Sequence, residues 1–247
     1  MTATPWPIQH DIRESMAFSA IVDINGVMNP KTGGFHVVQD AIDAKHKSIF
    51  VRDGTYPPFD IDYERVCVVG ESWDTLISAP VGENAITINQ GADGCIISNL
   101  EVRTPGGGGQ TKSGIYIDDI FAIVENIRCQ DSDLDAIYIS VNAASCVVRG
   151  GMFTGCDRAG IGLQGANNKI IGAHCSSNAG DGVYAAANTS DNSTVTGCNF
   201  ESNTGYGIDI GGGDENLVVV GNRMTNNTAG NYRDTSGTST FVGNDTT

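Results

Sequence analysis

Acidic, aromatic and amide side chains recur along this chain in a pattern that suits the chemistry of sugars. Two carboxyl groups held about 5–10 Å apart can act as general acid and base at a glycosidic bond. The candidate catalytic residues are Asp135, Asp157, Arg158 and Asp181. Tyrosine rings pack against the apolar faces of sugars, and carboxylates and amides bind hydroxyl groups or Ca²⁺. The candidate ligand-binding residues are Tyr116, Asp118, Tyr138, Gln164, Tyr184 and Asp209.

The same residues also have a purely structural explanation. Tyrosine favours strands because its ring packs well on a pleated surface, and aspartate favours turns because its side chain bonds to the nearby backbone. Three interpretations therefore stay open for these side chains: a structural role, the binding of a glycan or partner, and catalysis. The choice among them depends on the elements that position the side chains.

Most of the candidates lie in or beside a short motif that recurs along the chain. Its copies are GIYI at 114–117, AIYI at 136–139, GIGL at 160–163, GVYA at 182–185 and GIDI at 207–210. Successive copies begin 22, 24, 22 and 25 residues apart, a period typical of solenoid proteins. In a strand with a buried face, the third residue of each copy points outward. The predicted outer row, with a gap at its glycine, is Thr87, Tyr116, Tyr138, Gly162, Tyr184 and Asp209.

A second strand follows each copy of the motif. Before this strand come a branched residue, any residue, and then a Gly or Asn, which we call the closing residue of the coil. After the closing residue, apolar residues alternate with mostly polar ones. The residues that we expect to stack in the interior are Val102, Cys129, Phe153, Cys175, Phe200 and Met224. No single coil buries its apolar face alone, so neighbouring coils must stack. The sequence thus predicts an all-β fold, a parallel β-helix over residues 20–247.

Asparagines recur at one turn position of this predicted helix. Asn178, Asn203 and Asn227 each lie six residues after a closing Gly or Asn. An amide side chain has both donors and an acceptor, so we expect these three residues to pass hydrogen bonds from coil to coil.

The chain has seven cysteines, an odd number that excludes complete internal pairing. Cys129 and Cys175 fall in the predicted interior stack. No C-x-x-C pair and no Cys/His cluster with zinc spacing occurs. We therefore expect buried, reduced thiols that pack as small apolar side chains.

The composition limits the possible partners. The formal net charge is −15, which repels a phosphate backbone, so we expect no nucleic-acid partner. No apolar run is long enough to span a membrane. The first residues lack the basic region and apolar core of a signal peptide. The pattern also predicts no metal site and no cofactor, with Ca²⁺ on the spaced acids as the one alternative.

Residues 20–80 carry a more specific signal. The segments AIVDINGVMNPKTGGFHVVQDAIDA, SIFVRDGTY and VCVVGESWDTLI follow one another there. This order resembles the opening of pectin-lyase-like β-helix proteins, and the resemblance implies a right-handed helix. A helix over about 35–44 is expected to cap the first coil, since Phe35, Val38, Ala41 and Ile42 share one of its faces.

Proteins of this superfamily include lyases, hydrolases, esterases, epimerases and virus proteins without enzymatic activity, so the resemblance does not define an activity. The paired acids of polygalacturonases are matched by Asp118 and Asp119, without the other motifs of that family. The Trp73–Leu76 stretch lacks the glutamine of pectin methylesterases, and the Y-G-x-D-P-H motif of alginate epimerases is missing. The resemblance to pectate lyases leaves Arg158 open as a base.

Short turns and the missing signal peptide favour a virion structural protein over a secreted enzyme. We expect a capsid decoration, turret or short tail spike that binds a glycan, located in the virion. Residues 1–19 form an N-terminal arm for contact with other virion proteins, and the chain forms a homo-oligomer such as a trimer. The alternative is an extracellular polysaccharide lyase or hydrolase acting on an acidic polysaccharide; a bacterial surface scaffold is a third possibility.

Overall fold

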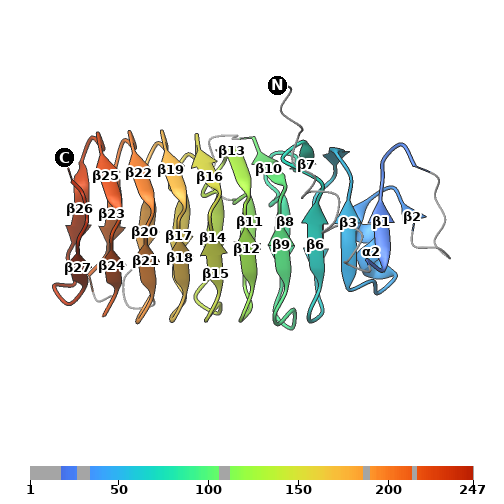
Figure 1. Cartoon of the computed structure of the whole chain (residues 1–247), viewed down its shortest axis with the longest axis horizontal. Coiled ribbons are helices and arrows are strands. Elements are labelled where there is room, and N and C mark those ends of the chain that lie inside the picture. Colours follow the sequence, from blue (N-terminus) through green and yellow to red (C-terminus); the bar gives the residue numbers. More distant parts are fainter. Residues whose placement is uncertain (1–17, 27–33, 106–111, 186–189, 213–215, 247) are drawn as a thin grey trace, which may run out of the picture.

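The structure, a computed structural model, describes residues 18–26, 34–105, 112–185, 190–212 and 216–246. Its described strands form a parallel β-helix whose coils follow one another along the long axis, from the N-terminal strands at one end to the C-terminal strands at the other (Figure 1). The predicted fold class is therefore confirmed. The predicted arm falls almost entirely on residues 1–17, which lie outside the described residues.

Each coil contributes one strand to each of three parallel sheets, which we call A, B and C. Sheet A has eleven described strands and begins with the short N-terminal strands. In spatial order they are β2 (Gly34–Phe35), β1 (Ala20–Val22), β3 (Ser48–Val51), β6 (Cys67–Gly70), β9 (Ile96–Ser98), β12 (Ile123–Glu125), β15 (Val147–Arg149), β18 (Lys169–Ile171), β21 (Thr194–Thr196), β24 (Val218–Val220) and β27 (Thr240–Val242).

Sheets B and C have eight described strands each. Sheet B consists of β4 (Gly54–Tyr56), β7 (Thr75–Ser78), β10 (Glu101–Thr104), β13 (Arg128–Ser132), β16 (Met152–Thr154), β19 (His174–Ser176), β22 (Asn199–Glu201) and β25 (Arg223–Thr225). Sheet C consists of β5 (Phe59–Ile61), β8 (Ile86–Ile88), β11 (Ile115–Ile117), β14 (Ile137–Ile139), β17 (Ile161–Leu163), β20 (Val183–Ala185), β23 (Tyr206–Ile210) and β26 (Gly230–Asp234).

The closing Gly or Asn of each coil forms the corner between sheets A and B. These residues are Asn99, Asn126, Gly150, Gly172, Gly197 and Gly221, and each has a φ between 51° and 66°. Glycine adopts this left-handed conformation without a Cβ clash, and asparagine tolerates it better than most residues. The corner geometry explains why only these two residue types close the coils.

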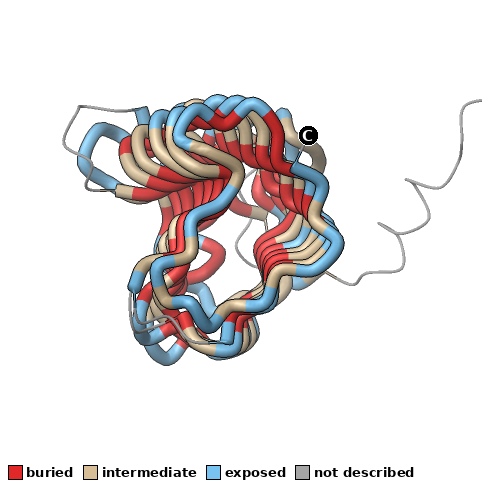
Figure 2. The backbone as a smooth tube through the Cα atoms, turned by 90° about the vertical axis from the view of Figure 1, so that its left-hand side faces the viewer, coloured by how far each residue is buried: buried red, intermediate tan, exposed pale blue. Residues whose placement is uncertain are grey.

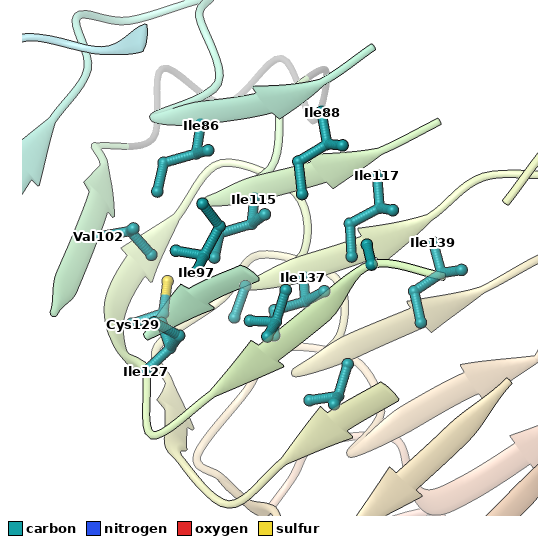
Figure 3. Packing of buried hydrophobic residues seen from close by; sticks show 14 of the residues in the cluster. Ile86, Ile88, Ile97, Val102, Ile115, Ile117, Ile127, Cys129, Ile137 and Ile139 are labelled. Carbon is teal, nitrogen blue, oxygen red and sulfur yellow. The ribbon is translucent and has the colours of Figure 1, made fainter. Parts of the chain in front are cut away.

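The interior is a continuous apolar stack, as the spacing predicted. Every residue of the predicted inner row is buried, and each pairs with the next across sheet B. On sheet C, isoleucines of β8, β11 and β14 line up in rows through the core (Figure 3). Seen end-on, the buried residues line the inside of successive coils (Figure 2). Neighbouring coils therefore share one core.

Asparagine side chains bond along the turns from coil to coil. Asn178 Nδ2 donates to Asn203 Oδ1, and Asn203 Nδ2 donates to Asn227 Oδ1, each over 2.9 Å. This confirms the predicted ladder. A second ladder, which the sequence analysis did not identify, includes Asn222, whose Nδ2 donates to Asn244 Oδ1 over 3.0 Å.

The N-terminal helix is shorter than expected. Helix α2 spans Val38–Asp43, and Phe35 belongs to strand β2 instead. Phe35 pairs with Val22 of β1, so the sheet extends further toward the helix than the spacing indicated. Val38, Ala41 and Ile42 are buried as predicted. The capping role of the helix stays a prediction.

All seven cysteines are unpaired, and six of them are buried. Cys67, on the outer side of sheet A, is half-buried. Burial raises the pKa of the Cys95, Cys146 and Cys198 thiols to about 11. The buried thiols therefore act as packing groups. Cys129 and Cys175, for which the sequence predicted this role, are among them.

Candidate functional site

The predicted tyrosine row lies on the outer side of sheet C. Strand register places the six predicted residues next to one another in the expected order, from Thr87 on β8 to Asp209 on β23. The rings of Tyr116 and Tyr138 are stacked, with centroids 5.5 Å apart and planes at 21°. Their faces therefore cover each other, and their edges point away from the sheet.

The gap at Gly162 is filled by Arg158. The guanidinium lies over the Tyr138 ring at 5.4 Å and over the Tyr184 ring at 5.3 Å from the centroids. A Cβ at position 162 would lie 2.8 Å from the Tyr138 ring and 2.9 Å from Arg158 Nη2. The gap in the predicted row is therefore occupied by a side chain of the protein itself. We call Tyr116, Tyr138, Arg158 and Tyr184 the sheet C face.

A buried carboxylate holds Arg158 in this position. Arg158 Nε donates to Asp135 Oδ1 over 2.9 Å, and Nη2 donates to Oδ2. The Ala159 amide also donates to Asp135 Oδ1, over 3.0 Å. Asp135 is fully buried, whereas 28% of the Arg158 side chain is exposed. Burial raises the pKa of Asp135, and the bonds from Arg158 and Ala159 oppose that rise.

These contacts change the roles proposed for two candidates. Asp135 has no exposed surface, and both of its oxygens are bonded, so it cannot be one member of an acid–base pair on a substrate. Pairing with Asp135 raises the pKa of Arg158 against the opposing effect of burial. A guanidinium in this state cannot act as a base.

Asp181 is a titratable candidate within reach of solvent. It is half-buried, and the Tyr206 amide donates to its Oδ1 over 2.6 Å. Burial and the nearby Asp209 raise its pKa to about 6, although the amide bond, Arg233 and Arg158 act in the opposite direction. Asp135 and Asp181 are separated by two strand spacings of sheet C, roughly 10 Å between backbones.

A second ion pair lies on the same side of sheet C. Arg233 Nε and Nη2 donate to the Asp209 carboxylate over 2.7 and 2.6 Å. The guanidinium also lies over the Tyr206 ring, 5.0 Å from its centroid. The sequence analysis identified Asp209 but missed Arg233, whose strand carries no copy of the motif. Register was the available signal, because Arg233 pairs with Asp209.

Asp118 and Gln164 follow the ends of their strands and bond to neighbouring coils. Asp118 accepts hydrogen bonds from the side chains of Ser140, Asn142 at 3.1 Å and Gln90 at 3.2 Å. Gln164 Oε1 accepts one from the Tyr138 hydroxyl. These bonds order the edge of the sheet C face. Asp157 is half-buried in the turn before β17, away from this edge.

A polar cavity of about 340 Å³ lies at the N-terminal end of the same sheet. Its lining residues are Gln39, Pro58, Phe59, Asp60, Gly82, Glu83, Asn84, Thr87 and Lys112. Thr87 continues the row from Tyr116 into this cavity. The sequence analysis did not predict the cavity, because helix α2 and a turn preceding β8 come together there only through the fold.

Two other kinds of feature, a metal site and a membrane-spanning helix, are considered for the described residues. Within the described ranges, no three His, Cys, Asp or Glu side chains converge as a metal site requires. The described helix is neither long nor apolar enough to cross a membrane. The Ca²⁺ alternative stays untested.

The three stacked parallel sheets and the shared core define a β-helix protein. The family model described as right handed beta helix region matches residues 84–246. The chain therefore belongs to this family, and the predicted right-handed fold is confirmed.

Two solved structures share the fold. The A-module of mannuronan C-5 epimerase AlgE4 from Azotobacter vinelandii aligns with a TM-score of 0.51 and 15% identity, over 90% of this chain and 85% of that one. The enzymatically active domain of tailspike protein 2 from bacteriophage CBA120 aligns with a TM-score of 0.51 and 11% identity, over 92% of this chain and 42% of that one. At these identities the likeness concerns the fold alone. A comparison with curated proteins found no match.

Proposed function

We propose that this protein is a β-helix component of a virus particle, a capsid decoration or short tail spike, and that its sheet C face binds a glycan. The observation that carries the binding proposal is the position of Arg158, between the rings of Tyr138 and Tyr184 and above buried Asp135. This cation lies between two tyrosine rings of the row.

Stability of the fold does not by itself explain a buried ion pair such as Asp135–Arg158. Taking two charges out of water is costly, and a well-packed apolar pair of similar volume often stabilises a protein as well or better. The bidentate bond to Asp135 uses Arg158 Nε and Nη2. Nη1 has no acceptor among the described residues and is the donor that we assign to a ligand.

Groups around Arg158 complete a surface suited to a hydroxyl-rich ligand. The Tyr184 hydroxyl has no hydrogen-bond partner in the described part of the chain. Asp181, one coil beyond Arg158 and in the turn before the strand of Tyr184, is half-buried and reaches solvent. Tyr138 is covered by Tyr116 and by Arg158, so it meets the ligand with its edge, while Tyr184 offers its hydroxyl. Such donors and acceptors match sugar hydroxyls and the carboxylates of acidic sugars.

The particle role is supported by the shape of the coils. Most described corners between sheets A and B have two residues, so long loops that would wall a catalytic groove are absent from these corners. The bacteriophage tailspike domain shares the fold. In this proposal the arm of residues 1–19 contacts other virion proteins, and the protein assembles as a homo-oligomer such as a trimer.

Affinity electrophoresis tests the glycan proposal. The full-length protein is run through gels containing alginate, polygalacturonate or dextran. We expect at least one polysaccharide to retard it and Tyr184→Phe, which removes one hydroxyl, to weaken the retardation. The matched control is Tyr232→Phe, because Tyr232 is an exposed tyrosine that pairs with Ile208 and therefore lies off the outer row. Equal retardation of the two variants, or none by any of the polysaccharides, would reject the glycan site.

A second candidate function is cleavage of an acidic polysaccharide by a lyase or hydrolase mechanism. The specific observation is Asp181, whose pKa of about 6 suits a group that exchanges a proton near neutral pH. The likeness to a mannuronan epimerase makes alginate the first substrate to test. Release of unsaturated or reducing ends by the wild type, lost in Asp181→Asn, would establish the enzyme. Binding without release favours the structural role.

A further inference from the structure

We propose that the corner between sheets A and B carries a second sugar-binding site, built around Trp73 and specific for a neutral pyranose. This site goes beyond the function proposed for the sheet C face and uses different strands. We call Glu71, Trp73, Asp74, Asn99 and Asn126 the Trp73 corner.

An insertion creates the corner. Two residues join sheets A and B in the next coils, Asn99 and Leu100 in one and Asn126 and Ile127 in the other. Four residues, Glu71–Asp74, join β6 to β7. The longer turn extends along the helix axis, and the Trp73 indole Nε1 donates to the backbone oxygen of Asn126, two coils away, over 2.8 Å.

A buried charge network fixes the indole. The Arg128 guanidinium lies over the ring, 5.4 Å from its centroid, and Nη2 donates to the Trp73 carbonyl over 3.3 Å. Arg128 is held by Glu101, which also pairs with Arg103 over 2.7 Å and is only 2% exposed. Arg128 thus covers one face of the indole, and Trp73 also lines the neighbouring cavity. A surface turn does not need this support, whereas a stacking platform does.

The space beside the indole has the size and lining of a sugar site. The cavity measures about 420 Å³ and is lined by Glu71, Ser72, Trp73, Asp74, Asn99 and Asn126. Small-molecule sites usually occupy about 300–1,000 Å³. An indole face packs on the apolar face of a pyranose, and amide and carboxylate groups bind its hydroxyls.

The charges of the lining select the class of sugar. Asn126 Nδ2 donates to Asn99 Oδ1, while Asn126 Oδ1 accepts no hydrogen bond from the described residues. It is thus ready to accept one from a sugar hydroxyl. The Glu71 and Asp74 carboxylates also line the cavity, and the cation nearest the indole, Arg128, is already paired. Acidic sugars are repelled at this corner and neutral ones are accepted.

Saturation-transfer NMR with the full-length protein tests the proposal. The probes are the methyl pyranosides of glucose, galactose and mannose, with glucuronic acid as the charged comparison. We expect saturation transfer to at least one neutral glycoside that depends on Trp73. Any transfer to glucuronic acid should come from the sheet C face and should not depend on Trp73. Trp73→Ala should abolish transfer to the neutral glycoside or weaken its binding by at least about tenfold, a factor that exceeds ordinary measurement error. The control Phe121→Ala, which removes an exposed aromatic ring outside both proposed sites, should leave it unchanged.

A milder pair of variants guards against misfolding. Trp73→Phe keeps an aromatic ring but loses the indole donor, so it should fold and bind more weakly than the wild type. Asp74→Asn keeps the volume of the side chain and should allow Trp73-dependent binding of glucuronic acid. The proposal fails if no neutral glycoside receives saturation, if folded Trp73→Ala binds the neutral glycoside as the wild type does, or if the signal of glucuronic acid depends on Trp73 as strongly as that of the neutral glycoside. If Tyr184→Phe lost binding while Trp73→Ala kept it, the neutral sugar would bind to the sheet C face and the proposal would be wrong.

Discussion

Arg158 occupies the space that Gly162 leaves open, and its guanidinium is stacked between the rings of Tyr138 and Tyr184. The glycine is thus part of the candidate site although it contributes no side chain. Any larger residue at position 162 competes with the guanidinium for the same volume.

Gly162→Ala should therefore destabilise the protein and displace Arg158. A Cβ there would lie 2.8 Å from the Tyr138 ring, and overpacking of this kind costs about 1–3 kcal/mol. The free energy of unfolding, from urea titration, measures the loss. The control is Gly212→Ala, where the nearest atom, Thr235 Oγ1, is 3.6 Å away. Equal effects of the two substitutions would show that position 162 is not crowded.

The Asp135–Arg158 pair should be sensitive to loss of one partner. Arg158→Ala leaves a fully buried carboxylate without its cation, which costs about 3–5 kcal/mol. Arg149→Ala removes a comparable but exposed pair with Glu125, where about 0–1 kcal/mol is expected. Urea unfolding compares the two. The double variant Asp135→Asn/Arg158→Ala should recover part of the loss, and an additive double variant would contradict the coupling.

Asp181 should make stability depend on pH. Its folded pKa of about 6 lies above the ordinary 3.8, so the stability gained by its protonated form is complete below about pH 3.8 and is lost as pH rises through 6. Asp181→Asn stays neutral throughout. The Tm of the variant minus that of the wild type should therefore increase between about pH 4 and pH 7. A constant difference across this range would contradict the raised pKa.

The cysteines should react in two classes. Burial raises the pKa of the Cys95, Cys146 and Cys198 thiols to about 11, and only thiolates react with a disulfide reagent. In the native protein, half-buried Cys67 should react first and the other six slowly; all seven should react quickly in urea. Cys67→Ser should remove the early phase. Rapid native modification of Cys129 or Cys175 would contradict their burial.

The interior of the helix could be predicted from sequence because strand register has a strict period of two. A residue such as Phe153 points inward if its neighbours in the adjacent coils, Cys129 and Cys175, do so. The left-handed corner conformation also restricts residue choice, so Gly150 and Asn126 mark the coil ends. These constraints are local or repeat with the period, and a single sequence displays them.

The candidate site was predicted less completely. Arg158 lies outside the strand motif, and its long side chain returns over Gly162 to reach Asp135 in the previous coil. Spacing identifies the glycine gap but cannot tell which side chain fills it. The start of helix α2 was predicted three residues too early, because Phe35 fits both a helix face and the short strand β2.

Binding of a glycan should protect the sheet C face from exchange. Hydrogen–deuterium exchange of the full-length protein is measured with and without the polysaccharide that retards it most in affinity electrophoresis. We predict slower exchange in residues 113–119, 136–142, 158–164 and 181–185, which form this face and its edges, and an unchanged rate in sheet A. Slower exchange confined to sheet A, or no change on any segment at a saturating concentration, would contradict glycan binding at this face.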